Sequence, residues 1–359
     1  MNVPASAPGG FRRVVRHFAP SWFAAVMGTG VVSITSFHYG ETYPLLRSVG
    51  TWLHGLNLVL FVLLFVPWTL RWLMERQAAV AALRHPIMGQ FYATFGIALL
   101  VLAGECLLYG HPLALSATLW GLGVIFSVLF SFAAFWLQFH GQQMELEHVT
   151  PGMFIPPVGL VVVPLAGQAL LPQVPAGWRE LILVANVASL GAGSFLWLGL
   201  MALTVHRFVL AKRLPGMLLP TIWINLGPIG VVSLDLIALA QGLPLPGARE
   251  TLPVLALMLW GFGLWWFAMA LLITLAYWRR GELPFSLAWW AFTFPLGAYA
   301  AASHRLGSLF GLESVWAIGF AAYLVLLVLW TAAFLGSLRG VVSGKLFLDP
   351  PAPSPSAAP

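Results

Sequence analysis

Three side chains between two apolar segments have the types and the spacing that a metal site needs. His140, Glu147 and His148 lie in the stretch HGQQMELEH, and separations of seven and eight residues place them near one face of a helix. Such residues could contribute to the metal site of a membrane-embedded metal-dependent enzyme. The segment is a hydrophilic loop without matching ligands elsewhere, and Cys106 is the single cysteine. We therefore expect no metal, no cofactor and no enzymatic activity.

Two carboxyl groups, Glu105 and Asp235, lie inside long apolar runs. Ionisable groups in a membrane are costly and are retained for function, so either one could bind the proton of a proton-coupled carrier. The same runs hold no Lys or Arg at mid-membrane depth. This scarcity of charge favours a weakly binding, channel-like conduit, and the coupled carrier is the alternative.

The composition indicates that these groups lie in a protein embedded in a lipid bilayer. Of 359 residues, 60% are hydrophobic and 8% are charged, with a mean hydropathy of +0.90. Runs of about 20 apolar residues are long enough to cross roughly 30 Å of hydrocarbon. They predict an all-α integral membrane protein with ten spans, at 18–37, 50–70, 88–108, 116–139, 152–171, 181–205, 216–240, 252–277, 284–303 and 314–335.

The basic residues predict the orientation of the chain. Ten spans place both termini on one side, and only four of the 17 Lys and Arg residues, Arg47, Arg179, Arg249 and Arg305, belong to the other side. Such an excess marks the cytoplasmic side. We expect a multi-pass protein of the cell (plasma or inner) membrane with cytoplasmic termini. The short basic loops serve topology, so we expect no nucleic-acid partner.

One membrane domain accounts for nearly all of the chain. The expected divisions are a cytoplasmic N-terminal segment at 1–17, a ten-helix domain at 18–340 and a disordered tail at 341–359. The tail ends in a Pro-, Ala- and Ser-rich stretch that has nothing apolar to bury.

A repeat runs through the predicted spans. A proline precedes or begins every odd-numbered span, and successive prolines are 66, 65, 64 and 69 residues apart: Pro20, Pro86, Pro151, Pro215 and Pro284. Proline is common at the start of a helix, but five at one spacing indicate a helical hairpin used five times in parallel orientation. We predict five hairpins in a quasi-fivefold ring around a central pore.

The odd-numbered spans are the better candidates for the inner wall of this ring. They hold small and kinking residues, which leave space along an axis, whereas the even-numbered spans are bulky and are expected to face lipid. The predicted pore-lining residues are Gly28, Thr29, Gly30, Thr94, Gly96, Pro157, Gly159, Asn225, Gly227 and Pro295.

The cytoplasmic mouth of the pore is expected to attract anions. All five inner helices present their N-termini there, and each carries roughly half a positive charge. A basic collar next to the repeat prolines would add to these dipoles, although basic residues at this place are also ordinary membrane anchors. Its members are His17, His85, His148 and Arg213.

Four segments of the sequence resemble one family of membrane proteins. HFAPSWFAAVMGTGVVS, RHPIMGQFYATFGIALL, TPGMFIPPVGLVVVPLAG and WWAFTFPLGAYAAA are similar to helices of the tellurite-resistance and dicarboxylate transporter family, within the slow anion channel superfamily. The resemblance covers essentially the whole chain. It implies ten helices around a quasi-fivefold pore, a homotrimer with one pore per subunit, and a phenylalanine of the ninth helix that occludes the pore.

The occluding phenylalanine would fall in AFTFP. Phe292 and Phe294 point about 200° apart on a helix, so at most one faces the axis. Phe294 adjoins Pro295 and best matches the family position, and Phe292 is the alternate gate. The resemblance thus implies a channel or transporter for small anions. Sulfite and C4-dicarboxylates such as malate are the expected substrates, and the neutral residues predicted along the pore do not choose between them.

Overall fold

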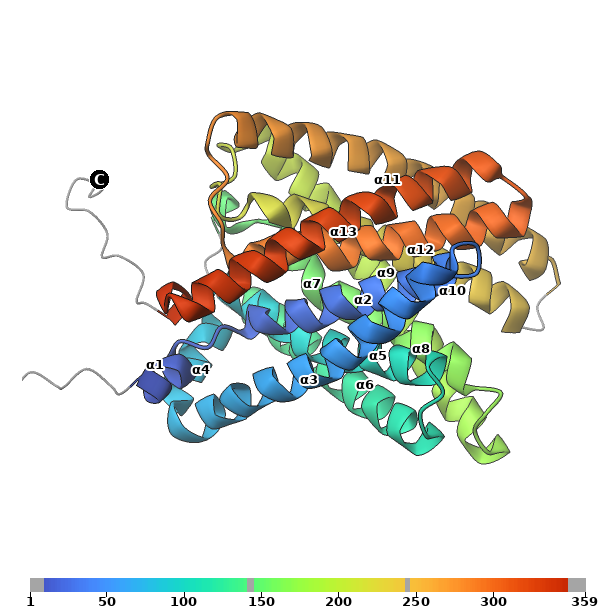
Figure 1. Ribbon diagram of the computed structural model, residues 1–359, viewed down its shortest axis with the longest axis horizontal. Helices are drawn as coiled ribbons and strands as arrows, with labels where there is room; N and C mark the ends of the chain where they lie inside the picture. Colours follow the sequence, from blue (N-terminus) through green and yellow to red (C-terminus); the bar gives the residue numbers. More distant parts are fainter. Residues whose placement is uncertain (1–9, 141–144, 243–245, 348–359) are drawn as a thin grey trace, which may run out of the picture.

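The computed structural model describes residues 10–140, 145–242 and 246–347, and within these ranges every regular element is helical. Eight segments are long and apolar enough to cross a membrane: α3 (Pro44–Met74), η2–α5 (Met88–Leu108), α6 (Leu113–Phe139), η4–α7–α8 (Pro151–Leu170), α9 (Ala176–Leu210), η5–α10 (Leu219–Gly242), α11 (Ala248–Arg279) and α13 (Glu313–Val342). In Figure 1 these helices cross the picture broadly from left to right and are splayed, with α13 rising and α6 descending toward the right.

The two remaining predicted spans are also helical. The segment η1–α2 (Pro20–Tyr39) counts as a ninth span if it is joined to α1 (Gly10–Arg16), from which it is bent by 89°. The segment η6 (Leu287–Phe292) with α12 (Thr293–Phe310) does not reach the same hydropathy, because it ends in polar residues that include Ser303, His304 and Arg305. Length and composition therefore support eight or nine of the ten predicted spans.

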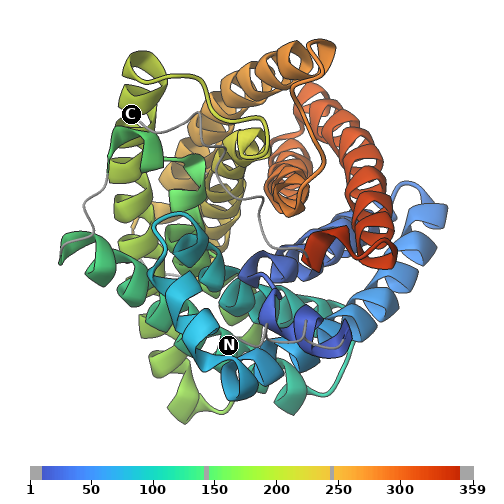
Figure 2. The same cartoon turned by 90° about the vertical axis from the view of Figure 1, so that its left-hand side faces the viewer.

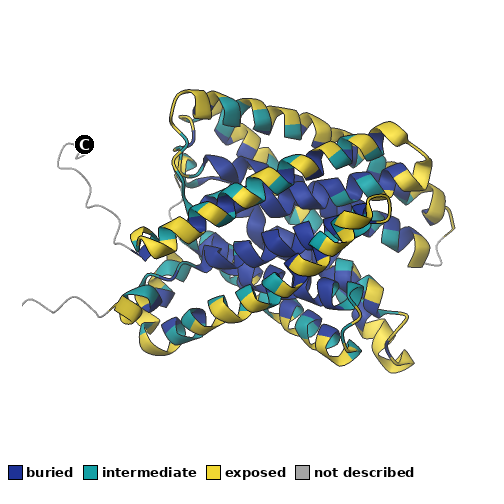
Figure 3. Cartoon of the chain, in the orientation of Figure 1, coloured by how far each residue is buried: buried dark blue, intermediate teal, exposed yellow. Residues whose placement is uncertain are grey.

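Burial separates inner from outer segments, as predicted. In the segments that contain α5, α7–α8 and α10, 83% of the most apolar stretch is buried, whereas in α3, α6, α9, α11 and α13 the share is 22% to 33%. Figure 3 shows the same division, with buried helices inside and exposed faces on the surrounding ones. The exposed faces carry large apolar side chains such as Phe132, Phe195 and Val328, which suits contact with lipid.

The five buried segments contact one another in a closed cycle. Helix α2 (Phe23–Tyr39) packs on α5 (Ala93–Leu108), α5 on α7 (Ile155–Val161) and α8 (Val163–Leu170), these on α10 (Leu226–Gly242), α10 on α12, and α12 on α2. Each inner segment also packs on the outer helix that follows it in the chain. Figure 2 looks along the bundle from the end at which α1 lies, with the outer helices at the periphery.

Every inner segment begins with a 3₁₀ stretch, at or just after its repeat proline. These stretches are η1 (Pro20–Trp22), η2 (Met88–Tyr92), η4 (Pro151–Phe154), η5 (Leu219–Asn225) and η6. They too contact in a closed cycle, η1 with η2, η2 with η4, η4 with η5, η5 with η6 and η6 with η1. Because η1 directly follows α1, all five lie at the end of the bundle that holds α1, which we call the near end; the opposite end is the far end.

The near end also holds the short elements α4 (Arg76–Arg84), η3 (Leu146–His148) and η7 (Lys345–Phe347). Residues 341–347, which we expect to be part of a disordered tail, form the end of α13 and η7. Phe347 is buried and stacks on Trp22, with ring centroids 6.2 Å apart. Apolar contact with η1 therefore orders this part of the chain, and residues 348–359 lie outside the described ranges.

Candidate functional site

A small cavity lies where the five inner segments meet. Its volume is about 40 Å³, and one water needs roughly 10–15 Å³ on this measure, so it has room for a few waters only. Side chains from all five inner segments line it: Ala24, Met27, Phe91, Thr94, Ile97, Ile155, Val158, Ile224, Leu287, Ala288, Trp290, Ala291, Phe294 and Pro295.

The two phenylalanines of the predicted gate lie in different surroundings. Phe294 lines the cavity. Phe292 is 1% exposed and packs edge-on against Trp223 and Trp289, with ring centroids 5.5 and 5.6 Å away. Of the two rings, only that of Phe294 is therefore in a position to fill or clear the space between the inner segments.

Two of the predicted pore-lining residues, Thr94 and Pro295, also line the cavity. The hydroxyl of Thr94 lies 2.9 Å from the carbonyl oxygen of Pro20 and 2.7 Å from that of Phe91, so backbone carbonyls satisfy it. The indole N–H of Trp290 donates to Ser337, away from the cavity. The wall therefore presents apolar surface, with no Lys, Arg, Asp or Glu among its residues.

Several other residues predicted along the pore lie at contacts between helices. A Cβ at Gly28 would collide with Thr293 of α12, and one at Gly96 would lie 2.6 Å from the backbone nitrogen of Ser127 in α6. A small residue can allow two helices to pack closely, or it can leave space along a pore axis. The sequence pattern does not distinguish these two roles.

The polar residues among them are turned outward. Thr29 accepts a hydrogen bond from the indole of Trp330 in α13, and Asn225 accepts one from Trp197 in α9. On α7, Pro157 places its carbonyl oxygen against Gly193 of α9. A Cβ at Gly159 would meet Ser127 at 3.4 Å.

Gly227 is different, because it adjoins the Phe294 ring: a Cβ there would lie 3.8 Å from Cε1 of Phe294.

The residues of the predicted collar already have partners at the near end. His85 Nδ1 accepts from the backbone N–H groups of Ile87 and Met88, and His148 Nδ1 accepts from that of Glu145. Burial, and secondarily the nearby His148, lower the pKa of His85. Arg213 lies 3.8 Å from Glu282 in an exposed ion pair.

His17 directly follows α1, and its backbone N–H donates to the carbonyl oxygen of Arg13. His140 and Glu147 belong, with His148, to the hydrophilic loop in which we expect no metal site. They lie on either side of residues 141–144, which are outside the described ranges. His140 stacks on Trp136 with centroids 3.7 Å apart. The described parts of the chain contain no group of three or more His, Cys, Asp and Glu residues that could hold a metal ion.

Glu105 and Asp235 are both fully buried, but only Glu105 has polar partners. Asn57 donates to Oε2 of Glu105 at 2.6 Å, and His54 Nδ1 lies 3.4 Å from Oε1. Neither oxygen of Asp235 has a hydrogen-bond partner among the described residues. Sequence reasoning missed His54 and Asn57. Their signal is two polar residues three positions apart in an apolar span, which places them on one helix face.

The chain is similar in sequence to several proteins named as transporters or efflux pumps. The chain is 40% identical to an uncharacterized transporter of Methanocaldococcus jannaschii, over 93% of this chain and 96% of that protein. It is 26% identical to a sulfite efflux pump of Arthroderma otae over 93% of each chain. It is 21% identical to a malic acid transport protein of Schizosaccharomyces pombe, over 88% of this chain and 76% of the other.

The family model for voltage-dependent anion channels matches residues 17–338. That range contains all five inner segments, the outer helices except the last four residues of α13, and the residues that line the cavity. The chain therefore belongs to the voltage-dependent anion channel family, whose members are channels and transporters.

Proposed function

We propose that this protein passes small anions across a membrane along the axis of its five inner segments, with Phe294 as the gate. The observation that supports this most strongly is the cavity to which all five inner segments contribute and which Phe294 lines. With room for only a few waters, the pathway is closed at this level. Movement of one aromatic ring would widen it without rearranging the helices.

The direction of the inner segments supports anions as the permeating species. All five begin at the near end, so their N-terminal dipole ends converge on that mouth. No acidic side chain lines the cavity to oppose an anion. We assign sulfite or a C4-dicarboxylate such as malate as substrate, by extension from the named activities of the fungal relatives.

The proposal includes ten spans in a quasi-fivefold ring, formed by the domain at 18–340. The closed cycles of contacts among the inner helices and among their 3₁₀ starts support it. Both termini belong to the cytoplasm of a cell (plasma or inner) membrane, and a homotrimer carries one pathway per subunit. Labelling of single cysteines placed at each end, and the mass of the particle in detergent, test these two assignments.

The experiment is a flux measurement on proteoliposomes loaded in turn with sulfite, malate and chloride. Efflux of at least one anion above that of protein-free liposomes is the expected result, and the three rates rank the substrates. Equal efflux with and without protein, for every anion and for Phe294→Ala as well, would overturn the proposal.

A further inference from the structure

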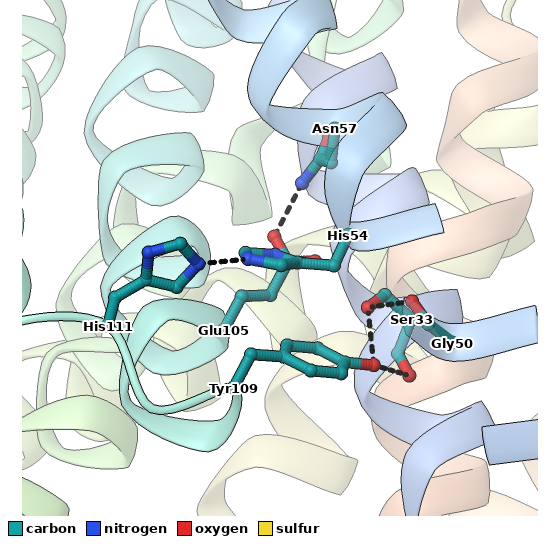
Figure 4. Close-up of polar contacts among 7 residues, drawn as sticks. All are labelled: Ser33, Gly50, His54, Asn57, Glu105, Tyr109 and His111. Atoms are coloured by element: carbon teal, nitrogen blue, oxygen red, sulfur yellow. Dashed lines mark hydrogen bonds and ion pairs between the residues drawn. The ribbon is translucent and has the colours of Figure 1, made fainter. Parts of the chain in front are cut away.

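A row of polar side chains at the far end leads from partly exposed His111 to fully buried Glu105 (Figure 4). Nε2 of His111 lies 2.9 Å from Nε2 of His54, and Nδ1 of His54 lies 3.4 Å from Oε1 of Glu105. We call this group, with its immediate neighbours, the Glu105 cluster: Ser33, His54, Asn57, Glu105, Tyr109 and His111.

At the inner end of the row, two buried atoms, Nδ1 of His54 and Oε1 of Glu105, face each other and can share a proton. The amide of Asn57 donates to Oε2 of Glu105, whereas Oε1 and the facing Nδ1 of His54 are buried without an aligned hydrogen bond. Buried polar atoms are nearly always paired. A proton between these two atoms would pair both of them.

The outer end of the row is fixed by the turn after α5. Gly110 has φ of 74°, and this turn lets the N–H of His111 donate to the carbonyl of Cys106 at 2.9 Å. The ring of Tyr109 stacks on that of His54, with centroids 4.5 Å apart and planes 12° apart. The imidazole of His54 is therefore held with one nitrogen toward each neighbour.

The titratable groups around Glu105 come from three elements. Helix α3 supplies His54, the turn after α5 supplies Tyr109 and His111, and α5 itself supplies Cys106. From α2, Ser33 bonds the hydroxyl of Tyr109 at 3.1 Å. Arg47, at the start of α3, is a charged side chain that acts on Tyr109.

We propose that Glu105 is a proton-binding site, loaded from the far end through His111 and His54, and that its occupancy controls how α2 packs on α5. His111 takes a proton from water and passes it to Nε2 of His54, while Nδ1 gives its own proton to Oε1 of Glu105. His54 stays neutral and changes tautomer, and return of the proton along the same route restores it. Only N–H and O–H bonds form and break, so no co-reactant is needed.

The site can act on the pathway because α2 approaches it closely. A Cβ at Gly30 would lie 2.9 Å from Oε2 of Glu105 and 2.8 Å from Nδ2 of Asn57, so only glycine allows this contact. One to two turns earlier, the same helix places Ala24 and Met27 on the cavity wall. A change in the charge of Glu105 therefore acts on a helix that lines the pathway. This link rests on the proposed function, whereas the proton site itself does not.

The proton site is tested by infrared difference spectra of the full chain in detergent after acidification. The native chain should gain a carboxylic-acid C=O band, and Glu105→Gln should lack this band. His54→Phe keeps an aromatic ring stacked on Tyr109, and in this variant the band should appear more slowly. Asp235→Asn and His140→Gln are the matched carboxyl and histidine controls and should leave this band in place. A band that survives in Glu105→Gln, or that is not delayed in His54→Phe, would overturn the site.

Control of flux is tested with the same variants in proteoliposomes as a function of pH. Anion flux of the native chain should change with pH, and Glu105→Gln, which imitates the protonated acid, should stay at the acidic value at every pH. A native pH response in Glu105→Gln, or its loss in Asp235→Asn instead, would overturn this control. Absence of anion flux in every form would refute the proposed function, and the infrared result would still decide the proton site.

Discussion

The ring of Phe294 lies against the backbone of Gly227, where a Cβ would stand 3.8 Å from Cε1 of that ring and 3.7 Å from the Cβ of Pro295. Two inner helices, α10 and α12, thus meet beside the proposed gate. The contact is an ordinary van der Waals distance, so a methyl group fits there and a larger side chain would press on the ring.

Substitution of Gly227 should therefore alter gating through Phe294. Gly227→Ala should keep native flux, and Gly227→Leu should lower it by confining the ring to the pathway. In a Phe294→Ala background the Leu substitution should lose most of its effect, because neighbours that act through one contact are not additive. Equal effects of Gly227→Leu in both backgrounds would show that the leucine itself blocks the path.

Gly96 should be needed for the close packing of α5 on α6. Gly96→Ala would place a Cβ 2.6 Å from the backbone nitrogen of Ser127, and overpacking of this kind costs about 1–3 kcal/mol. Gly104 lies in the same helix with no atom within 4 Å of a new Cβ, so Gly104→Ala should be neutral or stabilise by roughly 0.5–1 kcal/mol. Thermal unfolding in detergent measures both, and equal melting temperatures would contradict the close contact of α5 with α6.

Stability should fall on acidification because of His85. Burial, and then His148, lower its pKa from the ordinary value, so the folded state binds this proton less readily than the unfolded chain. Its stabilising contribution is present above the ordinary histidine pKa of about 6.5 and is lost as pH falls below it. Protonation also removes the Nδ1 acceptor for Ile87 and Met88.

The matched variant is His85→Asn, whose side-chain oxygen can accept the same backbone hydrogen bonds without titrating. Its melting temperature should decline less than that of the native chain as pH is lowered through the histidine range. Parallel declines in the two proteins would assign the acid sensitivity to other groups.

Arg213 should help anions to enter only when salt is low. It is exposed and only loosely paired with Glu282 at 3.8 Å, so its removal should cost no more than about 1 kcal/mol of stability. Arg213→Gln should slow anion entry from the near end at low ionic strength and not at high ionic strength, where the field is screened. Arg249→Gln, an exposed arginine at the start of α11, is the control and should leave this entry rate unchanged.

The sequence predicts the division between inner and outer helices because lipid leaves a strong compositional signal. The repeat prolines locate the starts of the five inner segments to within four residues. The 3₁₀ form of these starts is set by contacts among them, which residue spacing does not contain. The break at Val162, between α7 and α8, follows from Pro164, which has no N–H to continue the helical hydrogen bonds.

The direction of individual side chains was less predictable. Thr29 and Asn225 are predicted to line the pore because they are small or polar. In the structure they bind the indole N–H groups of Trp330 and Trp197, which belong to outer helices. The partners of Glu105 were missed for a similar reason. The histidines are remote in sequence and meet only after the turn at Gly110 brings His111 over α3.

The proposed gate is tested most directly by comparing anion flux through Phe294→Ala and Phe292→Ala in proteoliposomes, with the amount of folded protein matched. Phe292→Ala removes a ring packed between Trp223 and Trp289, so it should destabilise the fold by about 3–5 kcal/mol without opening the path. Phe294→Ala alone should raise the flux. Higher flux in Phe292→Ala, or no change in Phe294→Ala, would contradict the proposed gate.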